Sequence, residues 1–168
     1  MKATKYIVGG LFLSGLALII NYLFAKAKTS SNAGDSFGNP LKKMTIRKDV
    51  QGSGRFWKSR IGHYHEGIDI ECSLAEPVFS PISGTITKKS YPYPTDKRFE
   101  GCTIQNGISE IKLFYMVCGK VGQKVSKGEQ IGVCQAINIK YGSSMKNHLH
   151  IEIRQNGNLL NPETIYKL

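Results

Sequence analysis

The sequence predicts a mainly β fold: a compact antiparallel β-sheet or β-sandwich, preceded by one transmembrane helix. The chain of 168 residues contains 18 glycines and 8 tyrosines, which suit a turn-rich β domain better than a helical bundle. Short β-type segments are separated by turn residues, whereas the long apolar run lies near the N-terminus. With 40% hydrophobic and 21% charged residues, the length fits one packed domain plus a tether.

The N-terminal segment carries the prediction of a membrane helix. Residues 6–25 contain no charged side chain, and a helix of this length spans about 30 Å, the thickness of the hydrocarbon core. We therefore interpret residues 1–28 as a transmembrane signal-anchor. A cleaved signal peptide is the alternative, because Ala25-Lys26-Ala27 has the A-x-A form. Small polar residues follow, so residues 29–44 are predicted to be a flexible linker and residues 45–168 the folded domain.

Turn residues mark two boundaries within the domain. Asn106-Gly107 separates the β-type segments 102–105 and 108–117, which predicts a type I′ hairpin. Near the C-terminus, Asn161 followed by Pro162 predicts the first residues of a helix, with the asparagine as its cap.

The four cysteines do not form a C-x-x-C pair, which argues against a zinc-finger or thioredoxin motif. An even number in an exported domain predicts two disulfides. Cys118 and Cys134 are expected to be neighbours across an antiparallel pairing, which favours Cys118–Cys134 and, by default, Cys72–Cys102. Four buried free thiols are the alternative for a cytosolic domain.

The net charge of +11 favours anionic surroundings: nucleic acid, anionic lipid or an acidic polymer. A basic aromatic stretch, residues 56–60, would support nucleic-acid binding. The membrane segment argues against that partner, so we expect nucleic acid to be unlikely and an anionic wall polymer to fit better.

The four histidines fall into two pairs that bracket the domain: His63 with His65, and His148 with His150. Side chains two apart on a strand share a face, so His148, His150 and Glu152 are expected on one face and the aliphatic residues between them in the core. An ordinary solvent-facing strand surface is the alternative for this stretch.

The first pair is followed by a carboxylate at a suggestive spacing. His65 and Asp69 are four residues apart and are expected on the same side of an extended chain, with Gly67 letting the backbone pass close. Imidazole and carboxylate groups suit Zn²⁺. Two histidines and one acid would leave a fourth tetrahedral position open, as in a catalytic zinc site.

These motifs resemble the two signatures of the lysostaphin-type (LytM-like) zinc metallopeptidases. The resemblance covers roughly residues 50 to 168 in order, through the segments His65-Glu66-Gly67-Ile68-Asp69, Ala75 to Ile86, Val121 to Gly132, His148-Leu149-His150-Ile151-Glu152, and Asn156-Gly157 with Asn161-Pro162-Glu163.

The resemblance implies one Zn²⁺ held by His65, Asp69 and His150, with His148 as a catalytic group beside it. It implies hydrolysis of cross-bridge or stem peptide bonds in bacterial peptidoglycan. The protein is then expected to cross the bacterial inner (cytoplasmic) membrane once, with its C-terminal domain on the periplasmic or extracytoplasmic side. A phage virion membrane is a further option. The oligomeric state is left open.

One position departs from the family pattern. Val117 stands where the resemblance implies a second catalytic histidine, and valine cannot exchange a proton. His63 and Tyr115 are candidate substitutes, and Trp57 and Tyr64 are candidates to line a substrate groove.

The valine also favours an alternative function, a catalytically inactive zinc-binding module that binds wall polymer or regulates another hydrolase. The segments Asp69 to Ser73 and Leu113 to Tyr115 resemble leukocyte chemotaxin, a non-peptidase relative that also lacks the second histidine.

Overall fold

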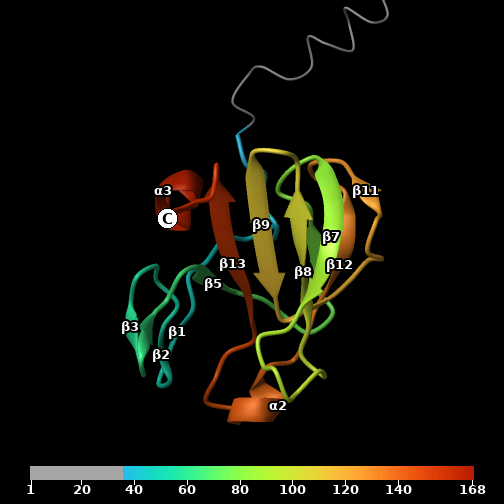
Figure 1. Ribbon diagram of the computed structural model, residues 1–168. Coiled ribbons are helices and arrows are strands. Elements are labelled where there is room, and N and C mark those ends of the chain that lie inside the picture. Colours follow the sequence, from blue (N-terminus) through green and yellow to red (C-terminus); the bar gives the residue numbers. More distant parts are fainter. Residues whose placement is uncertain (1–35) are drawn as a thin grey trace, which may run out of the picture. The chain divides into compact units, whose positions relative to one another are not determined.

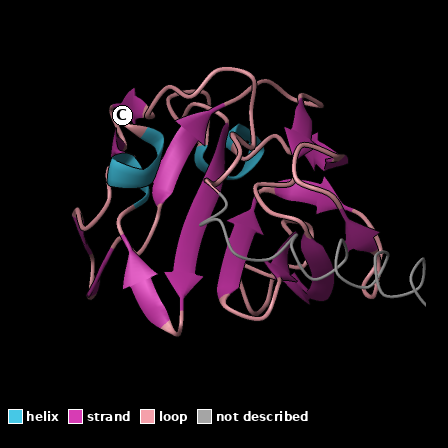
Figure 2. Cartoon of the chain, turned by 90° about the horizontal axis from the view of Figure 1, so that it is seen from above, coloured by secondary structure: helices cyan, strands magenta, loops and turns pink. Residues whose placement is uncertain are grey.

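The computed structural model describes residues 36–168, and this part of the chain is built mainly from antiparallel strands (Figure 1). The strands are β1 (Lys48–Asp49), β2 (Gly52–Ser53), β3 (Ser59–Arg60), β4 (His63–Tyr64), β5 (Ile68–Glu71), β6 (Pro77–Phe79), β7 (Gly84–Ser90), β8 (Gly101–Gln105), β9 (Ser109–Phe114), β10 (Met116–Cys118), β11 (Lys124–Val125), β12 (Gln130–Cys134), β13 (His148–Gln155) and β14 (Asn158–Leu160). Two short helices, α2 (Asn138–Tyr141) and α3 (Pro162–Tyr166), lie among the loops (Figure 2).

The strands form two main sheets. Seven strands make the larger sheet, in the order β11-β7-β8-β9-β13-β14, with β5 also paired to β13. Three strands make the smaller sheet, in the order β10-β12-β6, and the hairpins β1–β2 and β3–β4 are separate. Every pairing is antiparallel, so the predicted fold class is confirmed for the described residues.

The hydrophobic core joins the two sheets. Alternation places Ile111 and Leu113 of β9 inside, and Leu149 and Ile151 of β13 beside them, all fully buried. The same cluster includes Met116 and other residues of the smaller sheet. Because successive strand side chains point to opposite faces, this packing turns the histidines of β13 toward the other face.

The predicted anchor, residues 1–28, lies outside the described residues. Within residues 36–168, no helix has the length and apolarity needed to cross a membrane.

The compact unit begins earlier than the sequence predicts. Residues 37–44 belong to the stretch expected to be linker, yet Leu41 is only 1% exposed and lies in the core. The Gly38 amide donates to the Pro81 carbonyl at 2.8 Å, which attaches the segment to the domain. The structural boundary is therefore at Phe37 and not at residue 45.

The two predicted turn signals have different outcomes. The hairpin at Asn106-Gly107 connects β8 and β9 as expected, but its turn is not type I′. The Asn106 amide donates to the Ser109 carbonyl oxygen, so the central residues are Gly107 and Ile108. A type I′ turn needs a positive φ at both, and only Gly107 has one (91°). The helix start is confirmed: Pro162 opens α3, and the Asn161 side chain accepts a hydrogen bond from the Glu163 amide.

The predicted pairing of Cys118 with Cys134 is wrong. Their strands, β10 and β12, do pair, but Cys118 lies opposite Gly132 and Cys134 opposite Met116. The cysteines are free thiols in the structure. A register offset of two residues, which local sequence does not fix, separates the two side chains.

Tyr115 separates strands β9 and β10. Its φ of 65° is uncommon for a residue other than glycine, and it ends the strand that belongs to the larger sheet. The next residue, Met116, starts β10 of the smaller sheet. This break sets the direction of the Tyr115 side chain independently of the alternation along β9.

Candidate metal centre

Asp69 and His150 face one another across two neighbouring strands, β5 and β13, where they are direct register partners. His65 enters from the segment just before β5. Gly67 allows this approach, because a Cβ there would lie 2.3 Å from the Ile151 carbonyl oxygen and 2.8 Å from His150 Nε2. The four-residue spacing and the distant histidine therefore meet as the sequence predicts.

The three side chains bring one ligand atom each to a common point. Asp69 Oδ1 lies 3.1 Å from His65 Nε2 and 3.0 Å from His150 Nδ1, and the two nitrogens are 3.0 Å apart. Ligand atoms around tetrahedral zinc, with bonds of about 2.0–2.2 Å, are separated by roughly 3.3 Å or slightly more. The arrangement matches a compact metal site, and all three residues are buried.

Hydrogen bonds at the far side of each ring fix which nitrogen faces the ligand cluster. His65 Nδ1 lies 2.8 Å from the Arg55 carbonyl oxygen, and His150 Nε2 lies 3.3 Å from Glu152 Oε1. Carbonyl and carboxylate oxygens accept, so these nitrogens carry the protons. His65 Nε2 and His150 Nδ1 are then the nitrogens that face each other and a carboxylate oxygen, and a cation or a proton between them satisfies this arrangement.

A proton competes with a metal for this position. Burial lowers the pKa of His150, but its hydrogen bonds to Asp69 and Glu152 outweigh that effect and raise the pKa to about 9. Despite the opposing effect of burial, the contacts with His150 and His65 hold the Asp69 pKa well below its usual range. The carboxylate is therefore ionised and ready to bind a cation.

Arg47 holds the second oxygen of the same carboxylate. Its Nη2 donates to Asp69 Oδ2 at 3.2 Å, while Nη1 donates to both oxygens of Asp49 at 2.7 and 2.8 Å. The arginine is only 3% exposed. Because Oδ2 is engaged, Oδ1 is the oxygen aimed at the metal position. Arg47 was not predicted as a site residue, since no local motif links it to Asp69, 22 residues away.

His148 lies beside the metal position without belonging to the ligand set. Its Nδ1 lies 2.8 Å from the Lys146 carbonyl oxygen, which can only accept, so Nδ1 carries the proton. Its Nε2 faces the site, 3.9 Å from Asp69 Oδ1. Burial, the largest effect, lowers the His148 pKa, so the neutral ring offers a proton-accepting nitrogen next to the metal position.

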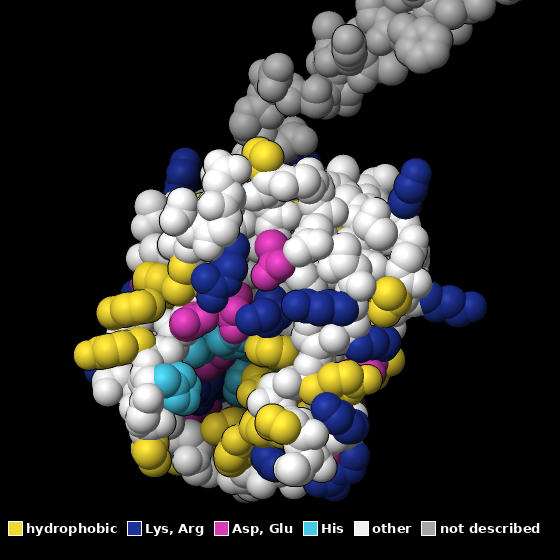
Figure 3. Space-filling model, in the orientation of Figure 1, with side chains coloured by type: hydrophobic (Ala, Val, Ile, Leu, Met, Phe, Trp, Pro, Cys, Tyr) yellow, Lys and Arg dark blue, Asp and Glu magenta, His cyan; other side chains and the backbone are white. Residues whose placement is uncertain are grey.

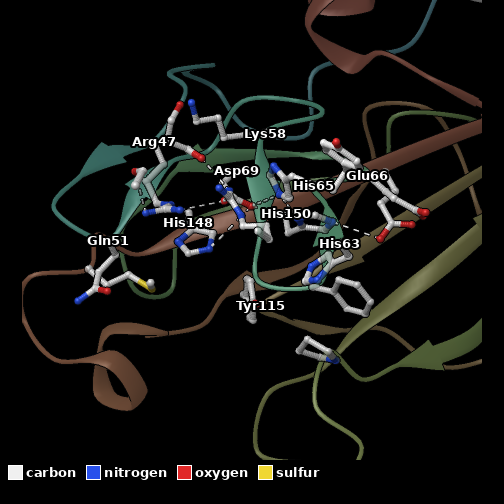
Figure 4. A pocket seen from close by; sticks show the side chains of 18 of the residues that line it. Arg47, Gln51, Lys58, His63, His65, Glu66, Asp69, Tyr115, His148 and His150 are labelled. Atoms are coloured by element: carbon white, nitrogen blue, oxygen red, sulfur yellow. Dashed lines mark hydrogen bonds and ion pairs between the residues drawn. The ribbon is translucent and has the colours of Figure 1, made fainter.

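Tyr115 packs edge-on against His148, with ring centroids 5.0 Å apart and planes at 80°. Its hydroxyl lies 3.0 Å from that of Tyr93, which in turn lies 2.9 Å from that of Tyr141. Burial raises the Tyr115 pKa to about 12, so the hydroxyl keeps its proton. Figure 4 shows Tyr115 approaching the histidines from the side opposite Lys58. The hydroxyl contacts of Tyr93 with Tyr115 and Tyr141 were not predicted.

The metal position opens into a cavity of about 1070 Å³. Figure 3 shows histidine side chains within this hollow, with charged and hydrophobic side chains around it. His63 and Tyr64 line the cavity from β4, and His63 is an exposed residue whose Nδ1 contacts the Ile61 carbonyl oxygen at 3.1 Å. Trp57 stacks on Tyr64, with centroids 5.1 Å apart and planes at 2°, and both rings are about half exposed.

Val117 is not among the described residues that line this cavity. It lies on β10 opposite Val133 and is 49% exposed. The position that the family pattern gives to a second histidine thus carries a solvent-facing aliphatic side chain. Of this segment, Phe114 and Tyr115 line the cavity, and Tyr115 is the one with a hydroxyl.

The fold and the site together define a metallopeptidase-like domain. Peptidase family M23 matches residues 63–162, more than half of the chain and the whole span from His63 to α3. The chain therefore belongs to peptidase family M23.

Individual relatives agree with this assignment. Leukocyte cell-derived chemotaxin-2 of Bos taurus is 31% identical over 105 residues, which cover 62% of this chain and 69% of the relative. An uncharacterized metalloprotease of Haemophilus influenzae is 28% identical over 151 residues, covering 84% of this chain and 30% of that protein. Lysostaphin shares the fold, with a TM-score of 0.57 and 20% identity over 80% of this chain and 55% of its own. The chain thus spans about half of lysostaphin and less than a third of the Haemophilus protein.

Proposed function

We propose that this protein is a zinc-dependent peptidase that hydrolyses cross-bridge or stem peptide bonds of bacterial peptidoglycan. One observation carries the proposal: one nitrogen each of His65 and His150 and an oxygen of Asp69 converge beside the proton-accepting nitrogen of His148, at an open cavity. A closed structural metal site would need a fourth protein ligand, whereas three ligands and an opening suit catalysis.

The metal would be held by His65, Asp69 and His150. Zinc bound there would supply a Lewis acid that polarises the scissile carbonyl and lowers the pKa of a water molecule. Glu152 orients His150, the Arg55 carbonyl orients His65, and Arg47 orients Asp69. Such outer partners fix ligand geometry and add to metal affinity.

His148 is the group that we assign to proton transfer. Its Nε2 lone pair faces the site, so it can accept a proton from the attacking water and return it to the leaving amine. The Lys146 carbonyl keeps the ring in the tautomer that this role needs.

Tyr115 is the residue that we assign in place of the second histidine. If the Tyr93 hydroxyl donates to Tyr115 and accepts from Tyr141, the Tyr115 proton is left to donate to a carbonyl oxygen that is gaining negative charge. His63 is less well supported as the substitute, because it is exposed and its Nδ1 contacts its own loop.

The location in the cell is part of the same proposal. A transmembrane anchor at residues 1–28 would hold the domain on the extracytoplasmic side of the inner membrane, next to the wall. The net charge of +11 supports attraction to anionic wall polymer.

The test is digestion of purified peptidoglycan by the zinc-loaded protein, with new amino termini counted against His150→Ala and His148→Ala. We expect release by the parent protein and none by His150→Ala, which should also lose the metal. His148→Ala should retain the metal but lose about 10²–10⁴-fold in rate. Absence of release by a parent protein that holds one zinc would exclude the peptidase function.

A second candidate is a zinc-stabilised binding module without hydrolysis. The exposed valine at position 117 favours it. One relative is named leukocyte cell-derived chemotaxin-2, and this name describes no peptidase activity. In that case the protein should bind one zinc and sediment with peptidoglycan while releasing no amino termini.

A further inference from the structure

The four cysteines form two pairs in space. The first cysteine pair is Cys102 and Cys118, on β8 and β10. The Cys118 thiol donates to the carbonyl oxygen of Gly101, the residue before Cys102, at 3.3 Å. The Met116 amide donates to the Glu100 carbonyl oxygen at 3.1 Å, so β10 runs directly beside this end of β8. The two thiols are in hydrogen-bond contact.

The second cysteine pair is Cys72, directly after β5, and Cys134, the last residue of β12. The Cys134 amide donates to the Glu76 carbonyl oxygen at 2.9 Å, and its own carbonyl oxygen accepts from the Ala75 amide at 3.0 Å. These contacts bring β12 against the turn that follows Cys72. The thiols of this pair are also in hydrogen-bond contact, and both side chains belong to the core or pack against it.

Both pairs cross between the same two sheets. β8 and β5 belong to the seven-stranded sheet, and β10 and β12 to the three-stranded sheet. Each pair therefore joins strands that are not hydrogen-bonded neighbours, at two different places in the sheet–sheet contact. A disulfide at such a place would reduce the conformational entropy of the unfolded chain and would connect strands that no backbone hydrogen bonds of a sheet connect.

We propose that both cysteine pairs close to disulfides, which link the two sheets, when the domain meets a disulfide oxidant. In each reaction one cysteine thiolate attacks the oxidant and displaces one of its sulfurs as a thiol. The second cysteine then attacks the mixed disulfide, which forms the Cys–Cys bond and releases the other half of the oxidant as a thiol. Two cysteine S–H bonds are lost, and one external disulfide becomes two thiols.

The first pair is arranged for this order of attack. Cys118 is partly exposed, whereas Cys102 is fully buried behind it. The hydrogen bond from Cys102 and the nearby ammonium of Lys89 lower the Cys118 pKa to about 7, which raises its thiolate fraction near neutral pH. Cys118 is then the attacking thiol and Cys102 the resolving one.

The two disulfides would restrain two chain segments that carry residues of the site. Cys72 follows the metal-ligand candidate Asp69 by three residues, and Cys118 follows Tyr115 by three. Oxidation should therefore stabilise the fold and the approach of Tyr115 to His148 together. The proposal does not depend on hydrolysis, because the thiol contacts exist whether or not the site is catalytic.

The test is peptide mapping of the full chain after incubation with glutathione disulfide, with remaining thiols alkylated under denaturing conditions. We expect Cys72 linked to Cys134, Cys102 linked to Cys118, and no alkylated cysteine. The oxidised protein should melt roughly 10 °C or more above the reduced protein.

Two variants with two cysteines each give the matched comparison. Cys72→Ser/Cys134→Ser keeps the first pair and should still close one bond. Cys72→Ser/Cys102→Ser keeps the two cysteines of the opposed strands, Cys118 and Cys134, and should keep both thiols free. Four alkylated cysteines in the oxidised parent, or any crossed linkage, would overturn the proposal even if a variant failed to fold.

Discussion

Asp69 Oδ1 and His150 Nδ1 lie 3.0 Å apart because the two residues are register partners on β5 and β13. The sheet, and not a local motif, brings them together across 81 positions of the chain. A shift of one residue in this register would send His150 to the core face and remove it from the site. Metal binding by this protein is thus a property of the strand pairing.

Replacing a ligand should remove the metal. We expect Asp69→Ala and His65→Ala to lower the zinc content from one ion to near zero, because two ligands hold zinc too weakly. Zinc is measured by elemental analysis after dialysis against a mild chelator. His63→Ala is the matched control. His63 lines the same cavity but lies outside the ligand cluster, so the zinc content of this variant should equal that of the parent protein.

Removing the Glu152 carboxylate, which accepts a hydrogen bond from His150, should weaken zinc binding without removing a ligand. Glu152 accepts from His150 Nε2 and from Lys112 Nζ at 2.6 Å. Glu152→Ala should therefore lower zinc affinity about 10–100-fold, measured by competition with a fluorescent chelator. Lys112→Ala leaves the bond to His150 intact and should change the affinity little. Equal losses in both variants would assign the effect to general destabilisation.

Removing the Tyr115 hydroxyl should separate catalysis from metal binding. For Tyr115→Phe we expect peptidoglycan hydrolysis to fall about 10²–10³-fold with one zinc retained, because the lost donor acts on charge that develops during the reaction. Tyr141→Phe removes the far end of the hydroxyl chain and should have a smaller effect. Unchanged activity in Tyr115→Phe would remove this residue from the mechanism and direct attention to His63.

Asp49 should make stability depend on acid pH. Burial opposes its ionisation, but hydrogen bonds from Arg47 and the Lys146 amide hold its pKa below 3.8. A lowered folded pKa means that the ionised carboxylate stabilises the fold above about pH 4, and that this contribution is lost as the pH falls through the folded value. Asp49→Asn should reduce the free energy of unfolding by about 1–3 kcal/mol at pH 7.

The difference between Asp49→Asn and the parent should shrink when urea unfolding is repeated near pH 3. Asp96→Asn is the comparison, because Asp96 pairs with Arg98 and Lys140 at the surface and should contribute little at either pH. A pH-independent deficit in Asp49→Asn would mean that its ion pair with Arg47 is not the cause.

Much of the metal centre could be predicted from local sequence. The alternation of polar and aliphatic residues in β13 gives the two faces of the strand, and the spacing of His65 and Asp69 survives as a contact at 3.1 Å. These are short-range features, since the period of a strand and the reach of four residues follow from backbone geometry. The mainly β fold followed from the same local patterns.

The sequence by itself determined the strand faces, the helix start at Asn161 and the three ligand candidates. Only the tertiary structure decided which cysteines meet, that Arg47 backs Asp69, and that Tyr115, not position 117, reaches the site. Those features depend on strand register and on one residue with a positive φ, where the chain passes from one sheet to the other. Such long-range relationships are fixed by packing between segments far apart in the chain, so no local pattern encodes them.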